Sequence, residues 1–145
     1  MSVAYGKGKK GLATKLHSSI IRSIGYCEKC FYQCPCIDKW KHGTACKLQA
    51  AHIEGRTASG TRTLLINAFC LCASDHKIFT DHPLMFSRWV TETWAQKFRE
   101  LLIELSRPTP KYDWDARYEE LKLYRQRLLQ GESLENLRQE EASNL

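Results

Sequence analysis

The chain has 145 residues, of which 43% are hydrophobic and 26% are charged. This length and composition are those of a globular protein with one domain and short appendages. No stretch approaches the roughly 18 consecutive apolar residues of a membrane helix, and no apolar segment near the start is followed by a small-residue cleavage site. We therefore expect a cytoplasmic protein that neither enters a membrane nor is secreted.

The net charge of +6 is unevenly distributed along the chain. Residues 1–23 contain five lysines and arginines and no acidic residue, whereas residues 131–145 contain four glutamates and one arginine. A basic segment favours binding to a polyanion such as DNA or RNA, because each neutralised phosphate releases counterions. The same charge also fits a solvated N-terminus. We expect residues 1–11 to be basic and flexible and the C-terminus to be an acidic tail.

The first half of the chain is expected to alternate between regular elements and irregular loops. A helix fits residues 12–24, because its apolar residues recur at helical spacing and Gly25 can end it. Residues 26–50 contain five cysteines and indicate an irregular loop held by a metal ion. Short strands are predicted over residues 48–53 and 63–66, joined by a loop rich in turn-forming residues.

The second half of the chain is predicted to be helical. The pattern becomes helical over residues 67–77, and a longer helix is expected over residues 83–106, with Pro83 in its first turn. Two prolines then interrupt the chain, and a last amphipathic helix fits residues 113–130. This helix could pack on the domain or mediate a homodimer. The elements together predict an α+β fold.

Seven cysteines in a chain without an export signal favour zinc binding over disulfide bonds. Cys27 and Cys30 form a C-x-x-C pair, which can offer two thiolates to one ion from a tight turn. Cys72 and Asp75 have the spacing of a second pair, with a carboxylate in place of the second thiolate. We therefore expect a structural Zn²⁺ at these four residues. Cys34, Cys36, Cys46 or Cys70 could supply a different fourth ligand, and several of them could instead be buried thiols. A second zinc ion could be held by Cys34, Cys36 and Cys46.

Three polar residues, His52, Asn67 and His76, have the types and the order that phosphodiester hydrolysis requires. His52 ends the first predicted strand, Asn67 lies where the next predicted strand gives way to a helix, and His76 lies on that helix. A neutral histidine can accept a proton from water near neutral pH. A divalent cation can neutralise the phosphate, and an amide can orient the base without adding charge. The predicted order brings both histidines to one small cleft.

The segments that contain these residues resemble the HNH endonucleases of phages and prophages. The similar segments lie within about residues 12–105 and read YCEKC, LQAAHIEGR, TR, INAFCLCASDHKIFTDHP and FSRWV. The resemblance implies a ββα-metal fold, a catalytic Mg²⁺, Mn²⁺ or similar ion, and a separate structural zinc. It assigns His52 as general base, Asn67 as positioning residue and His76 as a ligand of the catalytic ion. The substrate would be DNA, most simply double-stranded, in a bacterial host cell.

This resemblance also suggests how the chain is divided. Residues 12–106 would form the zinc-pinned nuclease domain, which includes the N-terminal helix. Residues 107–145 would form a C-terminal helical extension with the acidic tail.

The chain departs from the family pattern at three places. Many members have an acidic residue or a histidine just before the base, as a second ligand of the catalytic ion, and this chain has Ala51. Asp75 replaces an expected cysteine, and residues 31–47 are longer than the expected spacer. His82 could supply the missing ligand, and the carboxylate alternatives are Glu54, Asp75 and Asp81.

A different interpretation of His76 leads to a different class of protein. His76 could complete a zinc site with Cys27, Cys30 and Cys72, since three thiolates and one imidazole are a common structural set. The catalytic ion would then lose its ligand. The protein would in that case be a non-catalytic, zinc-containing DNA-binding module, for example a partner in phage packaging or recombination.

Basic residues near the motifs are candidates for contact with DNA phosphates. Arg56 follows the proposed base most closely, and Arg62 and Lys77 lie near the other two motifs. Phosphate contacts position a duplex without reading its sequence. The alternative for each is an ordinary solvated charge.

Overall fold

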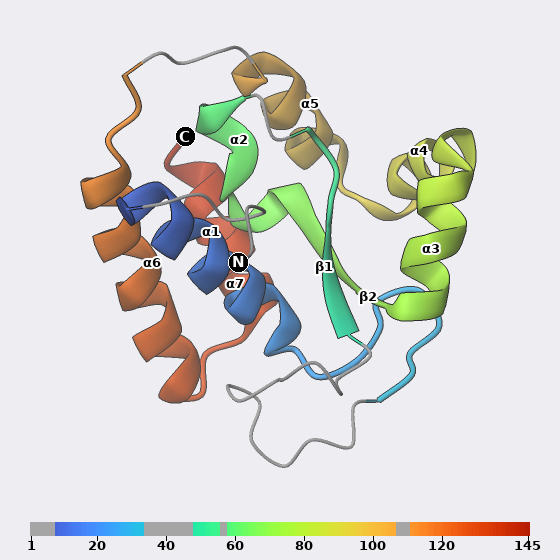
Figure 1. Ribbon diagram of the computed structural model, residues 1–145, viewed down its shortest axis with the longest axis horizontal. Helices are drawn as coiled ribbons and strands as arrows, with labels where there is room; N and C mark the ends of the chain where they lie inside the picture. Colours follow the sequence, from blue (N-terminus) through green and yellow to red (C-terminus); the bar gives the residue numbers. More distant parts are fainter. Residues whose placement is uncertain (1–7, 34–47, 56–57, 107–110) are drawn as a thin grey trace.

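The computed structural model describes residues 8–33, 48–55, 58–106 and 111–145, and this part of the chain has a mixed α+β fold (Figure 1). Two strands, one 3₁₀ helix (η1) and seven α-helices follow in this order: α1 (Gly8–Arg22), β1 (Leu48–His52), α2 (Ser59–Arg62), η1 (Leu65–Asn67), β2 (Ala68–Cys72), α3 (Ala73–Asp81), α4 (Pro83–Thr93), α5 (Gln96–Leu105), α6 (Trp114–Leu129) and α7 (Leu134–Ser143). None of these helices combines the length and the apolar composition that crossing a bilayer requires.

The centre of the fold is an antiparallel hairpin, followed directly by a helix. In this hairpin β1 pairs with β2, with Leu48 opposite Cys72 and His52 opposite Ala68. Side chains along a strand alternate between its two faces. The face that includes Leu48, Ala68 and His52 packs on α1, and the other face packs on α3 and α4 (Figure 1). The hairpin is therefore covered by helices on both faces.

The position of the second strand differs from the prediction. Residues 63–66 were expected to be a strand, but they lie in the turn after α2 and in η1, and the strand is Ala68–Cys72. A helix was expected at that place. The sequence AFCLC is an unbroken apolar run whose first four residues are buried. Such a run fits a strand covered on both faces as well as a buried helix, because it has no alternation to distinguish the two.

The single helix expected over residues 83–106 is two helices, α4 and α5. The break falls at Trp94, whose backbone is extended, with φ −86° and ψ 139°. The Trp94 indole N–H donates to the carbonyl oxygen of Ile66 at 2.9 Å, and its ring lies 4.4 Å from that of Phe69. These contacts hold the Trp94 side chain against the hairpin. An unbroken helix would point this side chain in a different direction.

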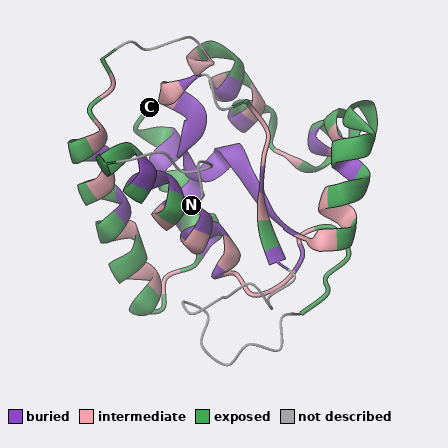
Figure 2. Cartoon of the chain, viewed as in Figure 1, coloured by how far each residue is buried: buried purple, intermediate pink, exposed green. Residues whose placement is uncertain are grey.

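The C-terminal helices share their core with the rest of the fold. Helix α6 occupies the range predicted for the last helix and is capped by Asp113, whose carboxylate accepts the N–H of Ala116 at 2.9 Å. Leu121 of α6 and Leu137 of α7 are fully buried, in one apolar cluster with Ile20 of α1 (Figure 2). The segment expected to be an acidic tail is thus the helix α7, and it is packed against the core.

Two arginines of the C-terminal helices bind buried groups. Arg138 donates to the carboxylate of Glu28 at 2.7 Å and to the carbonyl oxygens of Leu65 and Ala68 at 3.0 and 2.8 Å. The Glu28 carboxylate also accepts the N–H of Cys70 at 2.7 Å. Arg117 pairs with Glu141 in the same way, at 2.7 Å.

Replacement of Arg138 by methionine is expected to lower the free energy of unfolding by about 3 kcal/mol, because Glu28 would become an unpaired, nearly buried charge. The matched control is Arg127→Met. Arg127 also bridges two carboxylates, those of Glu132 and Glu140, but these groups are 38% and 45% exposed. Loss of such a surface pair should cost about 1 kcal/mol or less. Urea unfolding measures both variants, and equal losses would contradict the expected role of Arg138.

Candidate metal centre and the residues around it

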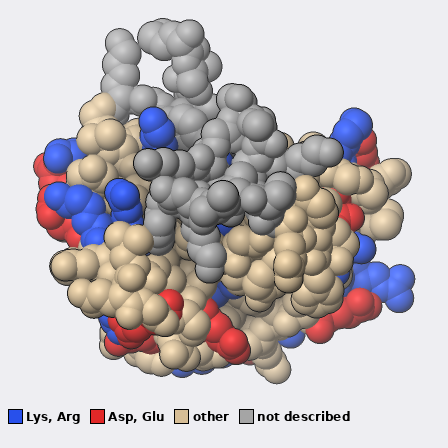
Figure 3. Space-filling view, turned by 90° about the horizontal axis from the view of Figure 1, so that it is seen from below, with Lys and Arg blue, Asp and Glu red and all other residues tan. Residues whose placement is uncertain are grey.

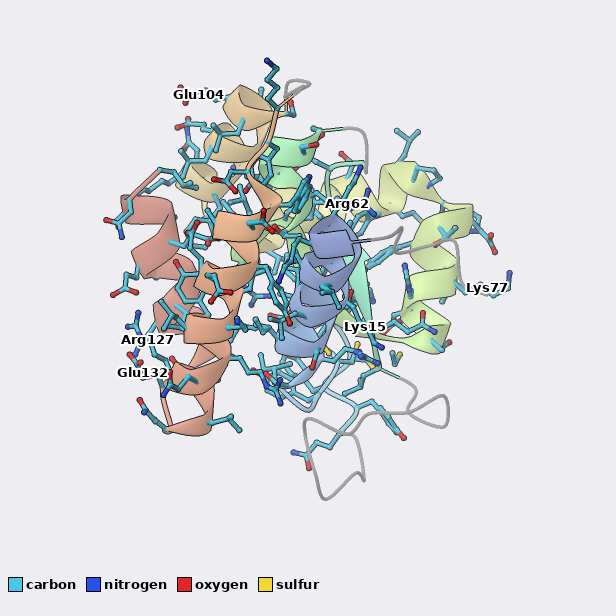
Figure 4. The ribbon with its side chains drawn as sticks, turned by 60° about the vertical axis from the view of Figure 1, so that its left-hand side comes forward. Lys15, Arg62, Lys77, Glu104, Arg127 and Glu132 are labelled. Carbon is cyan, nitrogen blue, oxygen red and sulfur yellow. The ribbon has the colours of Figure 1, made fainter. Side chains whose placement is uncertain are left out.

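Three thiols and one carboxylate meet at one end of the hairpin. The ligand atoms of Cys27, Cys30, Cys72 and Asp75 all lie within 4.8 Å of one another. Figure 4 shows sulfur atoms gathered between the lower end of α1 and the start of α3. The expected pairs are therefore brought together, and this cluster can hold a metal ion.

The two halves of the cluster are built in the same way. In the first half the N–H of Cys30 points to Cys27 Sγ at 3.5 Å, and in the second the N–H of Asp75 points to Cys72 Sγ at 3.4 Å. Each half thus places its second ligand three residues after the first, on a turn that aims a backbone N–H at a sulfur. Cys72 is also the N-cap of α3, so the helix begins at the metal centre.

The distances within the cluster fit a tetrahedral zinc ion. With Zn–S near 2.3 Å and Zn–O near 2.0 Å, sulfur atoms of a tetrahedral site are about 3.8 Å apart, and a sulfur and an oxygen about 3.5 Å. Cys30 Sγ and Cys72 Sγ are 3.8 Å apart. The Asp75 carboxylate oxygen is 3.3 Å from Cys27 Sγ and 3.4 Å from Cys72 Sγ. Soft thiolates with one carboxylate form a donor set that favours zinc over magnesium.

The surroundings of Cys30 and Asp75 shift the pKa values of both side chains. The N–H of the Tyr32 backbone favours the thiolate of Cys30, but desolvation and the neighbouring acids prevail and raise the pKa of Cys30 to about 12. Desolvation acts against the charge of Asp75, yet hydrogen bonds from the three thiols lower the pKa of its carboxyl below the ordinary value.

The structure selects Asp75, and not His76, as the fourth member of the cluster. This arrangement differs from the alternative Cys₃His set. Cys70 is buried in the apolar core and takes no part in the cluster. Cys34, Cys36 and Cys46 lie outside the described residues, as does any second metal site that they form.

His76 is turned toward β1 by Gln49. The Nδ1 atom of His76 lies 2.6 Å from Oε1 of Gln49. A carbonyl oxygen can only accept, so Nδ1 carries the proton and the lone pair is on Nε2. Partial burial lowers the pKa of His76, which favours this neutral form. A histidine that donates one ring N–H to an oxygen is in the state in which it binds metals.

No second ligand for an ion at His76 is evident in the described part of the chain. His82, the expected candidate, is exposed and follows the last residue of α3. Asp81 is paired with Lys77 at 3.0 Å. Apart from the cysteine cluster, the described residues contain no group of three His, Cys, Asp or Glu ligand atoms within reach of one ion.

Asn67 holds the segment that follows His52. Its side chain is fully buried, and its Oδ1 accepts the N–H of Glu54 at 2.8 Å. Its own carbonyl oxygen accepts the N–H of Ile53 at 2.8 Å. Both residues after His52 are therefore fastened to Asn67. This is the loop-fixing contact expected of an amide at this position, although Asn67 ends a 3₁₀ helix and does not begin an α-helix.

His52 and His76 belong to opposite faces of the hairpin. Gln49 and His52 are three residues apart on β1, so their side chains point to opposite faces. Gln49 contacts His76 of α3, whereas the ring of His52 lies 5.3 Å from that of His17 on α1. The prediction that both histidines line one cleft is therefore corrected. Ala51, which precedes the proposed base, is the buried neighbour on the α3 face.

His17 is a residue of this region that sequence reasoning missed. It is fully buried, and its Nε2 lies 2.9 Å from the carbonyl oxygen of Leu64. Burial lowers the pKa of His17 well below its ordinary value, and His52 lowers it further. A signal was present in the sequence, since His17 lies four residues after Ala13 and three before Ile20, within the buried stripe of α1.

The expected DNA-binding residues differ in their surroundings. Arg62 is only 7% exposed, and its Nε donates to Thr14 at 3.0 Å, so it is an interior residue and not a surface contact (Figure 4). Lys77 projects from α3 into solvent beside Asp81 (Figure 4). Arg56 lies outside the described residues. Basic and acidic side chains also lie next to each other around the edges of the face in Figure 3.

Comparisons of the chain with protein-family models, with curated proteins and with solved structures found no match.

Proposed function

We propose that this protein is a metal-dependent endonuclease of the HNH type, which hydrolyses DNA phosphodiester bonds and contains a structural zinc ion. The observation that carries the proposal is the attachment of the segment after His52 to the buried Asn67. These contacts support the roles of base and positioning residue for His52 and Asn67, which are 15 residues apart in the sequence. The strand, strand, helix order supports the same proposal.

In this proposal His52, Asn67 and His76 have different roles in hydrolysis. His52 accepts a proton from the water that attacks phosphorus, because a neutral imidazole is basic enough near neutral pH. Asn67 fixes the backbone beyond His52 and so limits the positions of its ring. From the other face of the hairpin, His76, oriented by Gln49, would present Nε2 to a divalent ion, so the scissile phosphate would lie at the edge that joins the two faces. Such an ion supplies neutralisation of the phosphate charge and stabilisation of the leaving oxygen.

The zinc cluster has a separate, structural role in this proposal. It joins the turn at Cys27 to the start of α3, which carries His76 one residue after Asp75. The position of His76 therefore depends on the cluster, while its side chain faces Gln49. Zinc and the catalytic ion would be held by neighbouring but different side chains.

Replacement of His76 by alanine tests the catalytic ion. We expect this variant to need much more Mg²⁺ or Mn²⁺, with cleavage of plasmid DNA reduced at least about 100-fold at a concentration that saturates the wild type. His82→Ala is the matched control, since His82 is an exposed histidine at the other end of α3, and it should cut like the wild type. A wild type that cuts with no divalent ion, or a His76→Ala variant that cuts equally well, would oppose the proposal.

A second candidate function has a specific observation in its favour. His52 and His76 belong to opposite faces of the hairpin, and Ala51 offers no ligand toward α3. A zinc-containing module that binds DNA without cutting it would need no such ligand. It predicts retention of DNA in a gel-shift assay at every divalent-ion concentration without cleavage.

A further inference from the structure

We propose that His17 is a positioning residue for His52, holding the ring of the proposed base in one tautomer from the core of α1. This inference rests on the proposed function for its catalytic meaning. Its structural part concerns two imidazole rings from elements far apart in the sequence. His17 comes from the middle of α1 and His52 from the end of β1.

The hydrogen bond to Leu64 defines the protonation state of His17. Its Nε2 is 2.9 Å from the carbonyl oxygen of Leu64, which can only accept a hydrogen bond. The proton of the neutral ring is therefore on Nε2, and the lone pair is on Nδ1. That Nδ1 is buried and has no hydrogen-bond partner among the described residues. A fully buried acceptor of this kind is uncommon in folded proteins and calls for an explanation.

We assign His52 as the hydrogen-bond partner of His17 Nδ1. The ring of His52 lies with its centroid 5.3 Å from that of His17, tilted by 43°, and its Nε2 is also buried. One N–H···N hydrogen bond between the two rings would satisfy both buried nitrogens. Burial disfavours a positive charge on His17, and His52, Arg117 and Arg138 disfavour it further. His17 thus acts as an acceptor and not as an acid.

This hydrogen bond would also define the tautomer of His52. A proton on Nε2 of His52, donated to Nδ1 of His17, leaves the lone pair of His52 on its own Nδ1. That nitrogen then accepts the proton of the attacking water. The resulting imidazolium keeps its Nε2–H on His17, and the hydrogen bond becomes charge-assisted and stronger. His17 would therefore orient the base and stabilise its protonated form, without contacting DNA.

Two substitutions separate this role from simple packing. Glutamine places its amide nitrogen near the position of Nε2, so His17→Gln keeps the bond to Leu64 and loses the acceptor at Nδ1. Asparagine places its amide oxygen near the position of Nδ1, so His17→Asn keeps that acceptor and loses the bond to Leu64. We expect His17→Gln to lower kcat about 10- to 100-fold with little change in KM or Tm. We expect His17→Asn to have a lower Tm but a kcat within about 3-fold of the wild-type value.

A purely structural His17 predicts the opposite order, with activity following Tm and His17→Asn the more damaged variant. That order would overturn the inference. Nitrogen-15 NMR of the histidine rings in the full chain provides a second test that needs no activity. We expect His52 to carry its proton on Nε2 in the wild type and its tautomer populations to change in His17→Gln. An unchanged His52 tautomer in His17→Gln would refute the inference. A changed tautomer, together with a wild type that does not cleave DNA, would refute only the proposed function.

Discussion

The Cys27→Ala variant is expected to bind one metal ion fewer than the wild type and to lose about 4 kcal/mol of stability. This estimate corresponds to a free zinc concentration about 1,000 times the dissociation constant, and tighter binding would increase it. Binding energy is folding energy here, because the four ligands come from two segments more than 40 residues apart and meet only in the folded chain.

The effect should extend beyond the cluster itself. Glu28, inside the first cysteine pair, accepts the N–H of Cys70 and binds Arg138 of α7. Loss of the metal frees the turn that carries Glu28, so the contact between α7 and the hairpin should loosen as well. Hydrogen exchange would detect this as faster exchange in α7 and β2.

Cys70→Ala is the matched control for this prediction. Cys70 is as completely buried as Cys27 and lies in the same apolar cluster, but it is not part of the metal centre. It should keep the full metal content and lose only about 1 kcal/mol through the small cavity. Metal analysis, X-ray absorption and urea unfolding provide the measurements. Equal metal content in wild type and Cys27→Ala, or coordination without three sulfurs, would contradict the assignment.

The His52→Ala variant is expected to cleave DNA about 10²- to 10⁴-fold more slowly than the wild type, the range associated with loss of a general base. The reason is that no other described imidazole is placed on this face of the hairpin next to the loop that Asn67 fixes, apart from the buried His17, whose ring is held by Leu64. Single-turnover cleavage of supercoiled plasmid with Mg²⁺ or Mn²⁺ measures the rate.

The same experiment includes a check on the role of His52 itself. Added imidazole should restore part of the lost rate in His52→Ala, since a small base can enter the space left by the side chain. Zinc content should change little, because the metal cluster lies at the opposite end of β1. If the variant cuts at the wild-type rate, the general base is another group.

Local patterns predicted several parts of this protein correctly. The apolar spacing of residues 12–24 and 113–130 predicted α1 and α6 to within a few residues. The Cys27/Cys30 and Cys72/Asp75 pairs were also predicted together as one metal centre. The two helices and each half of the metal centre depend on residues three or four apart, and a helical turn or a metal-binding turn places such residues side by side whatever surrounds them.

Features that depend on burial could not be predicted in the same way. The run AFCLC has no alternation, so its assignment to a strand depends on β1 and on the helices that cover both faces. The break at Trp94 follows from its hydrogen bond to Ile66, a contact between residues 28 positions apart. Arg138 and Glu141 lie in the segment that was expected to be an acidic tail, and their partners Glu28 and Arg117 make their burial favourable.

The sequence alone determined which residue types are available for chemistry: two cysteine-containing half-sites, an asparagine and two histidines in the order His52, Asn67, His76. The tertiary structure decided how they are combined. Asp75 joins the thiols, Gln49 turns His76 away from them, and His17 meets His52 on the other face of the hairpin. The physical reason is that spacing along the chain sets the geometry within one turn, whereas the side of a sheet to which a residue points is set by register and packing.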